Sequence, residues 1–175
     1  MWSRAHPDMG GRMLDDIAAE WGVTRDAAID RLHPAGAIYF CMDEGDLRRI
    51  IAFPTSMIGS DGIPGSEKPH PRLWGTFPRV LGRYAREEGL LSLAQAVHKM
   101  TGLSAAQFGL ADRGRLAPGC KADVVVFDAE RVIDRATYDD PEQPAAGISH
   151  VLVNGAVALA DGVQTGERAG AFLHH

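Results

Sequence analysis

Ala37-Ile-Tyr-Phe-Cys-Met42 is an apolar run without polar alternation, and it sets the expected fold class. Such a run is typical of a strand buried on both faces, as in a parallel sheet covered by helices. Asp43 can cap a helix over residues 44–53, and Ser56-Met-Ile-Gly59 predicts a second short buried strand. The alternation of strands and helices favours an α/β fold.

Helices are predicted on both sides of these two strands. Residues 11–33 carry apolar residues at three- and four-residue spacing, interrupted at Gly22 and restarted by Thr24 as an N-cap. Residues 77–88 have the same periodicity. Two further helices begin at capping boxes, in which a serine and a glutamine three residues later satisfy free backbone groups: Ser92–Gln95 and Ser104–Gln107.

The pattern changes after Gly114, where strands replace helices. Residues 122–127 predict a strand, and the polar, proline-bearing residues 128–147 predict a long connection. Asn154-Gly155 between two apolar runs is typical of a type I′ hairpin, because both central residues of that turn need a positive φ. We therefore expect two domains, an α/β part over residues 1–112 and a small β part over residues 113–175.

The predicted α/β part is incomplete as a fold. Two parallel strands cannot cover both faces and both edges of a sheet, and a (β/α)₈ barrel needs roughly 250 residues. We expect that the missing neighbours belong to another chain or to a longer sequence of which this is the C-terminal part. The alternative is a compact small α/β fold with a different arrangement of elements.

The overall composition excludes several classes of protein. The chain has 175 residues with 23 acidic and 18 basic ones, a net charge of -5 that argues against a nucleic-acid binder. Its two cysteines cannot form a disulfide-rich scaffold, and we expect buried thiols. No apolar run reaches the ~18 residues of a membrane span, and the start lacks a secretory signal. We expect a cytoplasmic protein that binds neither nucleic acid nor membrane.

The second predicted strand, at residues 56–59, runs straight into Ser60-Asp61-Gly62. Functional side chains of α/β barrels stand at the C-terminal ends of strands, where a carboxylate can act as a metal ligand or as a general base. Ser60-Asp-Gly62 is equally an ordinary turn sequence. The residues alone leave both interpretations open.

Longer motifs follow in the loop after Asp61 and beyond it. They are Ile58-Gly-Ser-Asp-Gly-Ile-Pro64, His70-Pro-Arg-Leu-Trp-Gly-Thr-Phe-Pro-Arg79, Asp112-Arg-Gly-Arg-Leu-Ala-Pro-Gly119 and Gly147-Ile-Ser-His-Val-Leu-Val-Asn-Gly155. With these motifs the chain resembles the C-terminal part of the N-acyl-D-amino-acid deacylases (D-aminoacylases) of the amidohydrolase superfamily. The resemblance extends over about residues 10 to 170.

The resemblance implies a zinc-dependent hydrolase that converts N-acyl-D-amino acids to a carboxylate and a D-amino acid. It implies a (β/α)₈ TIM barrel followed by a small β-sandwich domain. Residues 37–42 and 56–60 would be the last two barrel strands, and residues 115–160 would be the C-terminal share of the sandwich.

The resemblance also implies roles for four residues. Asp61 would be the catalytic carboxylate, taking a proton from the attacking water and delivering it to the leaving amine. Arg72 would hold the substrate α-carboxylate through two parallel hydrogen bonds, unless it only forms a loop salt bridge. Tyr39 and Met42 would line the pocket for an apolar side chain, unless they are plain barrel core.

The chain departs from the family mainly in its metal ligands. The family uses a His-x-His pair, a thiolate and further histidines in segments that this chain does not match, so Asp61 is the only possible metal ligand from the expected set. Cys41 is interpreted as a packing thiol, and His70 as a turn residue. Since catalytic zinc generally needs three protein ligands, we expect this chain alone to bind zinc poorly.

Three interpretations follow for the chain. It is an incomplete piece of such an enzyme, whose partners are the missing N-terminal barrel half and a small N-acyl amino acid. Alternatively, it is a non-catalytic scaffold or a partner subunit of a split amidohydrolase. The third is a piece of a related dihydropyrimidinase-like amidohydrolase.

Overall fold

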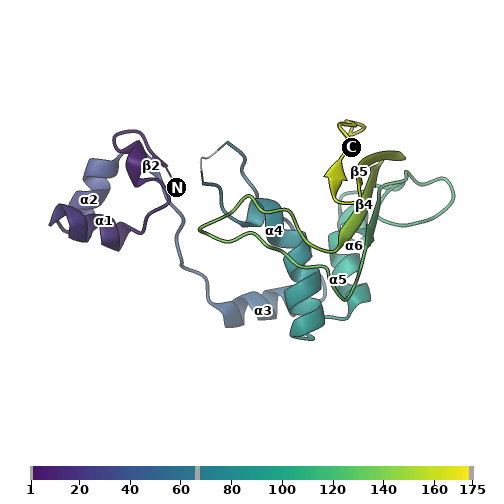
Figure 1. Cartoon of the computed structure of the whole chain (residues 1–175). Coiled ribbons are helices and arrows are strands. Elements are labelled where there is room, and N and C mark those ends of the chain that lie inside the picture. The colour runs from purple at the N-terminus through teal and green to yellow at the C-terminus, as the bar shows by residue number, and fades with distance from the viewer. Residues whose placement is uncertain (1, 66–67, 174–175) are drawn as a thin grey trace. The chain divides into compact units, whose positions relative to one another are not determined.

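The structure is a computed structural model that describes residues 2–65 and 68–173, and it combines helices with two antiparallel sheets in an α/β fold (Figure 1). The helices are the short 3₁₀ helix η1 (Pro7–Met9), α1 (Leu14–Trp21), α2 (Arg25–Leu32), α3 (Glu44–Ala52), α4 (Arg72–Arg79), the π-helix η2 (Val80–Glu87), α5 (Leu93–Met100) and α6 (Gly102–Gln107). The strands are β1 (Trp2–Ser3), β2 (Ala35–Gly36), β3 (Val124–Phe127), β4 (Ile148–Val153), β5 (Ala156–Ala160) and β6 (Val163–Gln164).

The chain divides into two compact units, each built from separate segments of the sequence. Unit 1 comprises Met1–Cys41, Asp61–Trp74 and Ala136–Gln143, and unit 2 comprises Met42–Ser60, Gly75–Arg135 and Pro144–His175. The loop between β3 and β4 therefore contributes residues to unit 1, although its two ends belong to unit 2. The predicted domain boundary at residues 112–113 stays a prediction.

The two helices predicted over residues 11–33 are confirmed in unit 1. Gly22 ends α1 in a left-handed conformation with φ of 62°, and the side chain of Thr24 accepts a hydrogen bond from the Ala27 amide to begin α2. The helices bury the side chains of Ile17, Ala18, Ala28 and Leu32. Strands β1 and β2 form a two-stranded antiparallel sheet beside them.

Unit 2 has a core between helices and the segment after β3. The predicted Asp43 cap is confirmed, since its carboxylate accepts a hydrogen bond from the Asp46 amide at 3.0 Å. The capping box at Ser92 and Gln95 is also confirmed. The core side chains are Ile51, Val80, Leu81, Tyr84, Ala85, Leu91, Ala96 and Val132.

The sheet of unit 2 has the strand order β3-β4-β5-β6, with every neighbouring pair antiparallel. Its centre is the predicted hairpin, in which Asn154 and Gly155 have φ values of 49° and 86°. Two positive φ angles in succession are the mark of a type I′ turn, which explains the Asn-Gly sequence at this point.

The two predicted parallel strands, at residues 37–42 and 56–59, are absent from the described structure. A strand needs a neighbour to satisfy its backbone N–H and C=O groups, and none lies beside either segment among the described residues. Tyr39 and Met42 are accordingly exposed, at 79% and 69%, and Cys41 is exposed as well. In the second segment, the Ile58 amide donates to the carbonyl of Lys99.

Two helix boundaries also differ from the prediction. The helix expected over residues 77–88 already begins at Arg72, with Pro78 inside it, and continues as the π-helix η2. Gly102 begins α6, so Ser104 lies within that helix and its hydroxyl donates to the Lys99 carbonyl instead of capping. None of the helices in the described residues is long and apolar enough to cross a membrane.

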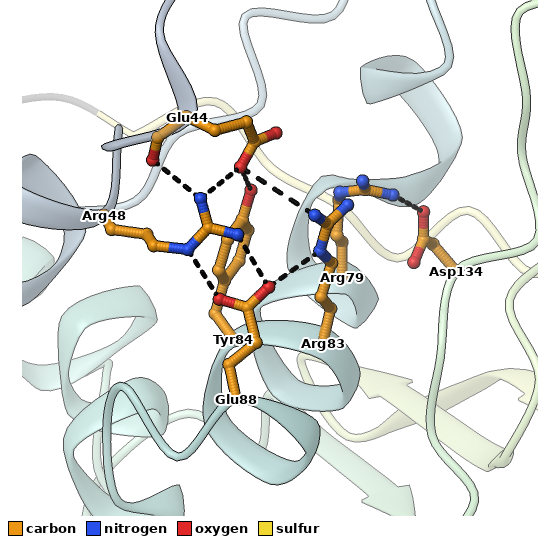
Figure 2. Close-up of polar contacts among 7 residues, drawn as sticks. All are labelled: Glu44, Arg48, Arg79, Arg83, Tyr84, Glu88 and Asp134. Carbon is orange, nitrogen blue, oxygen red and sulfur yellow. Dashed lines mark hydrogen bonds and ion pairs between the residues drawn. The ribbon is translucent and has the colours of Figure 1, made fainter. Parts of the chain in front are cut away.

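A charged network joins α3 to the end of η2 (Figure 2). Glu88 accepts two hydrogen bonds from Arg48, at 2.8 and 3.0 Å, and a third from Arg83 at 3.0 Å. Arg48 also pairs with Glu44 at 3.0 Å. The hydrogen bonds from Arg48 and Arg83 hold the pKa of Glu88 below its usual range.

Replacing Glu88 with glutamine is expected to lower the thermal unfolding midpoint at pH 7 by roughly 2 °C, the scale of an exposed ion-pair network. A carboxyl group whose folded pKa is lowered contributes stability above its unfolded pKa, and the contribution is lost as pH falls through the folded pKa. The difference from the wild-type chain should therefore be full at neutral pH, begin to shrink near pH 4.5 and vanish once the pH lies below the lowered folded pKa of Glu88. Thermal melts across this pH range check the predicted difference. Glu87→Gln is the control, because Glu87 carries the same charge one residue earlier and pairs with its neighbour Arg86, outside the Arg48–Glu88 network. A difference that persists in acid would contradict the assignment.

Candidate functional site

Asp61 has an unusual backbone conformation. Its φ is 47°, in the left-handed region that non-glycine residues rarely occupy, and its side chain is 77% exposed. Conformations of this kind concentrate at functional sites, where surrounding structure holds them in place. The geometry thus presents the carboxylate outward at the position for which the sequence predicts catalysis.

The Asp61 carboxylate pairs with Arg72, the first residue of α4, at 2.8 Å. Both belong to unit 1, and the Arg72 side chain is 38% exposed. An ion pair this exposed contributes little to stability, since water screens both charges. The pairing therefore brings together the two predicted polar site residues without burying either.

Gly62 allows the loop after Asp61 to approach Leu73 in α4 closely. A Cβ atom at Gly62 would lie 2.9 Å from Cα of Leu73, closer than real Cβ atoms approach backbone atoms. The absence of a side chain at Gly62 thus lets the segment after Asp61 pack directly on the first turn of α4.

Gly62→Ala is expected to destabilise the chain by about 1–3 kcal/mol, the range for inserting an atom into a packed contact. Gly59→Ala is the matched control, because a Cβ atom at Gly59 would meet nothing within 4 Å. Denaturant unfolding of both variants checks the prediction. Equal stabilities would show that the Gly62–Leu73 contact does not constrain the loop.

Two aromatic residues of unit 1 lie close to this pair. The His70 ring accepts a hydrogen bond from the Arg72 amide at Nδ1, at 3.0 Å, and its Nε2 lies 3.5 Å from the Tyr138 hydroxyl. Burial lowers the pKa of His70, and the charge of Arg72 lowers it further, while Asp61 acts in the opposite direction. His70 is thus a neutral acceptor at pH 7.

Sequence reasoning missed Tyr138 altogether and treated His70 as a turn residue. Tyr138 lies in the polar connection between β3 and β4, where the one available signal was an isolated aromatic residue among polar ones. Of the other two predicted pocket residues, Tyr39 belongs to unit 1 and Met42 to unit 2, and both side chains are exposed. Their role in substrate binding stays a prediction.

The described residues do not fit a zinc site. Nowhere in residues 2–65 and 68–173 do three or more His, Cys, Asp or Glu side chains gather in a group that could hold a metal ion. Catalytic zinc generally has three protein ligands, so Asp61 alone cannot supply the site.

Comparison with known proteins agrees with the motifs. The model of the amidohydrolase family matches residues 14–159. The chain belongs to the amidohydrolase family. Among curated relatives, a D-aminoacylase from Alcaligenes xylosoxydans xylosoxydans is 56% identical over 98% of this chain and 36% of the relative. An N-acyl-D-glutamate deacylase from the same organism is 62% identical over 88% of this chain and 32% of the relative.

A solved structure of this amidohydrolase group has the same fold. The N-acyl-D-glutamate deacylase from Bordetella bronchiseptica, complexed with zinc and a phosphonate mimic of the tetrahedral intermediate, matches with a TM-score of 0.87 and 57% identity. The match covers 90% of this chain and 33% of that one. The chain thus spans about a third of the length of the relatives it matches.

Proposed function

We propose that this chain contributes the proton-transferring carboxylate and the carboxylate-binding arginine to a zinc-dependent deacylase of N-acyl-D-amino acids. The observation that carries the proposal is the pairing of Asp61 with Arg72, within a chain 56% identical to a D-aminoacylase. The reaction is hydrolysis of an amide to a carboxylate and a free D-amino acid.

Asp61 is proposed to act as general base and then as general acid. Its carboxylate takes a proton from the water that attacks the amide carbonyl carbon. When the carbon–nitrogen bond breaks, the same proton passes to the leaving amine, and the carboxylate is restored. The 77% exposure of the Asp61 side chain supports this role, because an incoming substrate and its water can approach the carboxylate from solvent.

Arg72 is proposed to bind the α-carboxylate of the substrate. Its guanidinium already holds one carboxylate, that of Asp61, and can exchange it for a substrate carboxylate of the same geometry. This exchange would also release Asp61 for proton transfer. Tyr39 and Met42 are proposed to line the pocket for the substrate side chain.

The architecture completes the proposal. We propose that residues 1–112 form the last part of a TIM barrel, and that residues 113–175 form the C-terminal share of a β-sandwich domain. The zinc ligands would then come from an N-terminal barrel half outside the described residues, as the missing ligand group supports. The unpaired segments at residues 37–42 and 56–59 would become strands when that half is present.

A hybrid enzyme tests this function. In the hybrid, this chain replaces the matching 36% of the Alcaligenes D-aminoacylase. The zinc-loaded hybrid is expected to release methionine from N-acetyl-D-methionine, whereas this chain alone, given zinc, is expected to release none. A folded, zinc-loaded hybrid without turnover would favour a non-catalytic scaffold instead.

A further inference from the structure

We propose that His70 and Tyr138 are positioning residues for Arg72. His70 contacts Arg72, Tyr138 contacts His70, and together they keep Arg72 in the orientation that receives a substrate carboxylate. This inference rests on the proposed function of Arg72 and adds two residues to its site. The structural part of the inference, however, concerns only contacts within unit 1 and can be tested without turnover.

The first contact fixes the backbone of Arg72. The first amides of a helix have no partner within the helix, and the amide of Arg72 at the start of α4 donates to Nδ1 of His70 at 3.0 Å. A nitrogen that accepts an N–H cannot carry a hydrogen itself, so the neutral ring has its hydrogen on Nε2. The His70 ring is thus a side-chain cap with a defined tautomer.

The second contact fixes the His70 ring. The Tyr138 ring stands edge-on to it, with centroids 5.3 Å apart and an interplanar angle of 77°. Tyr138 meets Phe40 in a second edge arrangement, at 4.9 Å and 65°. Edge-to-face pairs at these separations are favourable, and they restrict ring rotation. The contact between the Tyr138 hydroxyl and Nε2 is long, at 3.5 Å, so ring packing carries most of the restraint.

The loop that carries Tyr138 is braced by its own hydrogen bonds. The Thr137 amide donates to the Asp140 carbonyl, and the Asp140 amide donates to the Thr137 hydroxyl, both at 3.0 Å. The Gln143 amide group adds a bond to the Asp140 carboxylate. These hydrogen bonds fix the turn that carries Tyr138. Tyr138 can therefore restrain the His70 ring although the two residues are 68 positions apart in sequence.

The charge state of His70 suits this role. Among the described residues, the charged and titratable groups that act on the ring are Arg72 and Asp61, and the Tyr138 hydroxyl lies beside it. Burial and the Arg72 charge lower the pKa of His70, so Nδ1 keeps its lone pair at pH 7. A protonated ring would lose the acceptor and would place a second positive charge beside the guanidinium.

The structural test uses the chain itself. Nitrogen NMR shifts of the His70 ring should report the Nε2–H tautomer. In Tyr138→Leu, hydrogen exchange of the Arg72 amide should accelerate about three- to tenfold, the equivalent of one neutral hydrogen bond weakened. The Nδ1–H tautomer, or unchanged exchange at Arg72, would overturn the inference whatever the hybrid does.

The functional test uses the hybrid enzyme and separates binding from chemistry. His70→Leu should raise KM for N-acetyl-D-methionine about tenfold and leave kcat within about twofold, because it acts only through Arg72. His70→Asn should restore most of the affinity, since its side-chain oxygen can replace Nδ1 as acceptor. With N-acetyl-D-methioninol, which lacks the carboxylate, all variants should match the wild-type hybrid.

The two tests can separate failure of the positioning role of His70 and Tyr138 from failure of the proposed deacylase function. If kcat falls while KM is unchanged, or if His70→Asn is as impaired as His70→Leu, the positioning role is wrong although the deacylase function stands. If the hybrid has no activity at all, the proposed function fails, and a positioning role in catalysis fails with it. The NMR and hydrogen-exchange results still show whether His70 and Tyr138 restrain Arg72.

Discussion

Asp61→Asn is expected to lower kcat of the hybrid enzyme for N-acetyl-D-methionine by about 10²- to 10⁴-fold, the usual contribution of a general acid–base group. Asparagine has nearly the same shape and tolerates the left-handed backbone of this position, but it cannot accept the proton of the attacking water. KM should change little, because substrate affinity is assigned to Arg72. Steady-state kinetics at saturating zinc provide the measurement.

Asp161→Asn is the matched control for this substitution. Asp161 also has a positive φ, of 50°, and lies exposed in the turn after β5, so the same chemical change is made on the same kind of backbone. The control should keep full activity. If Asp61→Asn retained more than about a tenth of wild-type kcat, Asp61 would not be the proton-transferring group.

Lys99→Met is expected to destabilise the chain by about 3 kcal/mol, more than a hundredfold in the unfolding equilibrium. Lys99 is only 4% exposed, and its ammonium donates to oxygens at the end of α3 and just beyond it. These acceptors are the Phe53 carbonyl, the Ser56 carbonyl and hydroxyl, both at 3.1 Å, and the Pro54 carbonyl at 3.4 Å. Methionine fills similar space but leaves these oxygens without their donor.

Lys121→Met is the control for Lys99→Met, because Lys121 is exposed and the same substitution there should change stability by less than about 0.5 kcal/mol. Denaturant unfolding of both variants gives the comparison. Equal stabilities would show that water replaces the ammonium without loss. Because Lys99 anchors residues 53–58, just before Asp61, its loss should also weaken turnover in the hybrid.

Local chemistry explains which parts of the fold were predictable. The boundaries at Gly22, Thr24, Asp43 and Ser92 depend on caps formed within a few residues, and all four are confirmed. The Asn154-Gly155 turn is local in the same sense. The capping box predicted at Ser104 was wrong because α6 already begins at Gly102, and the Ser104 hydroxyl donates to the Lys99 carbonyl instead.

Predictions that need distant partners fared differently. Residues 37–42 have the composition of a buried strand, yet a strand exists only where another pairs with it, and the described chain offers none. Asp61 and Arg72 were identified through motifs, whereas their pairing came from the structure. Tyr138 was beyond prediction, because only folding brings the β3–β4 loop to His70.

The most direct test of the central claim is the rate at which the zinc-loaded hybrid hydrolyses the two enantiomers of N-acetylmethionine. We expect turnover of the D enantiomer at a rate comparable to the parent D-aminoacylase, with little turnover of the L enantiomer, because Asp61 and Arg72 of this chain complete the site. A folded, zinc-loaded hybrid that hydrolyses neither enantiomer would contradict it.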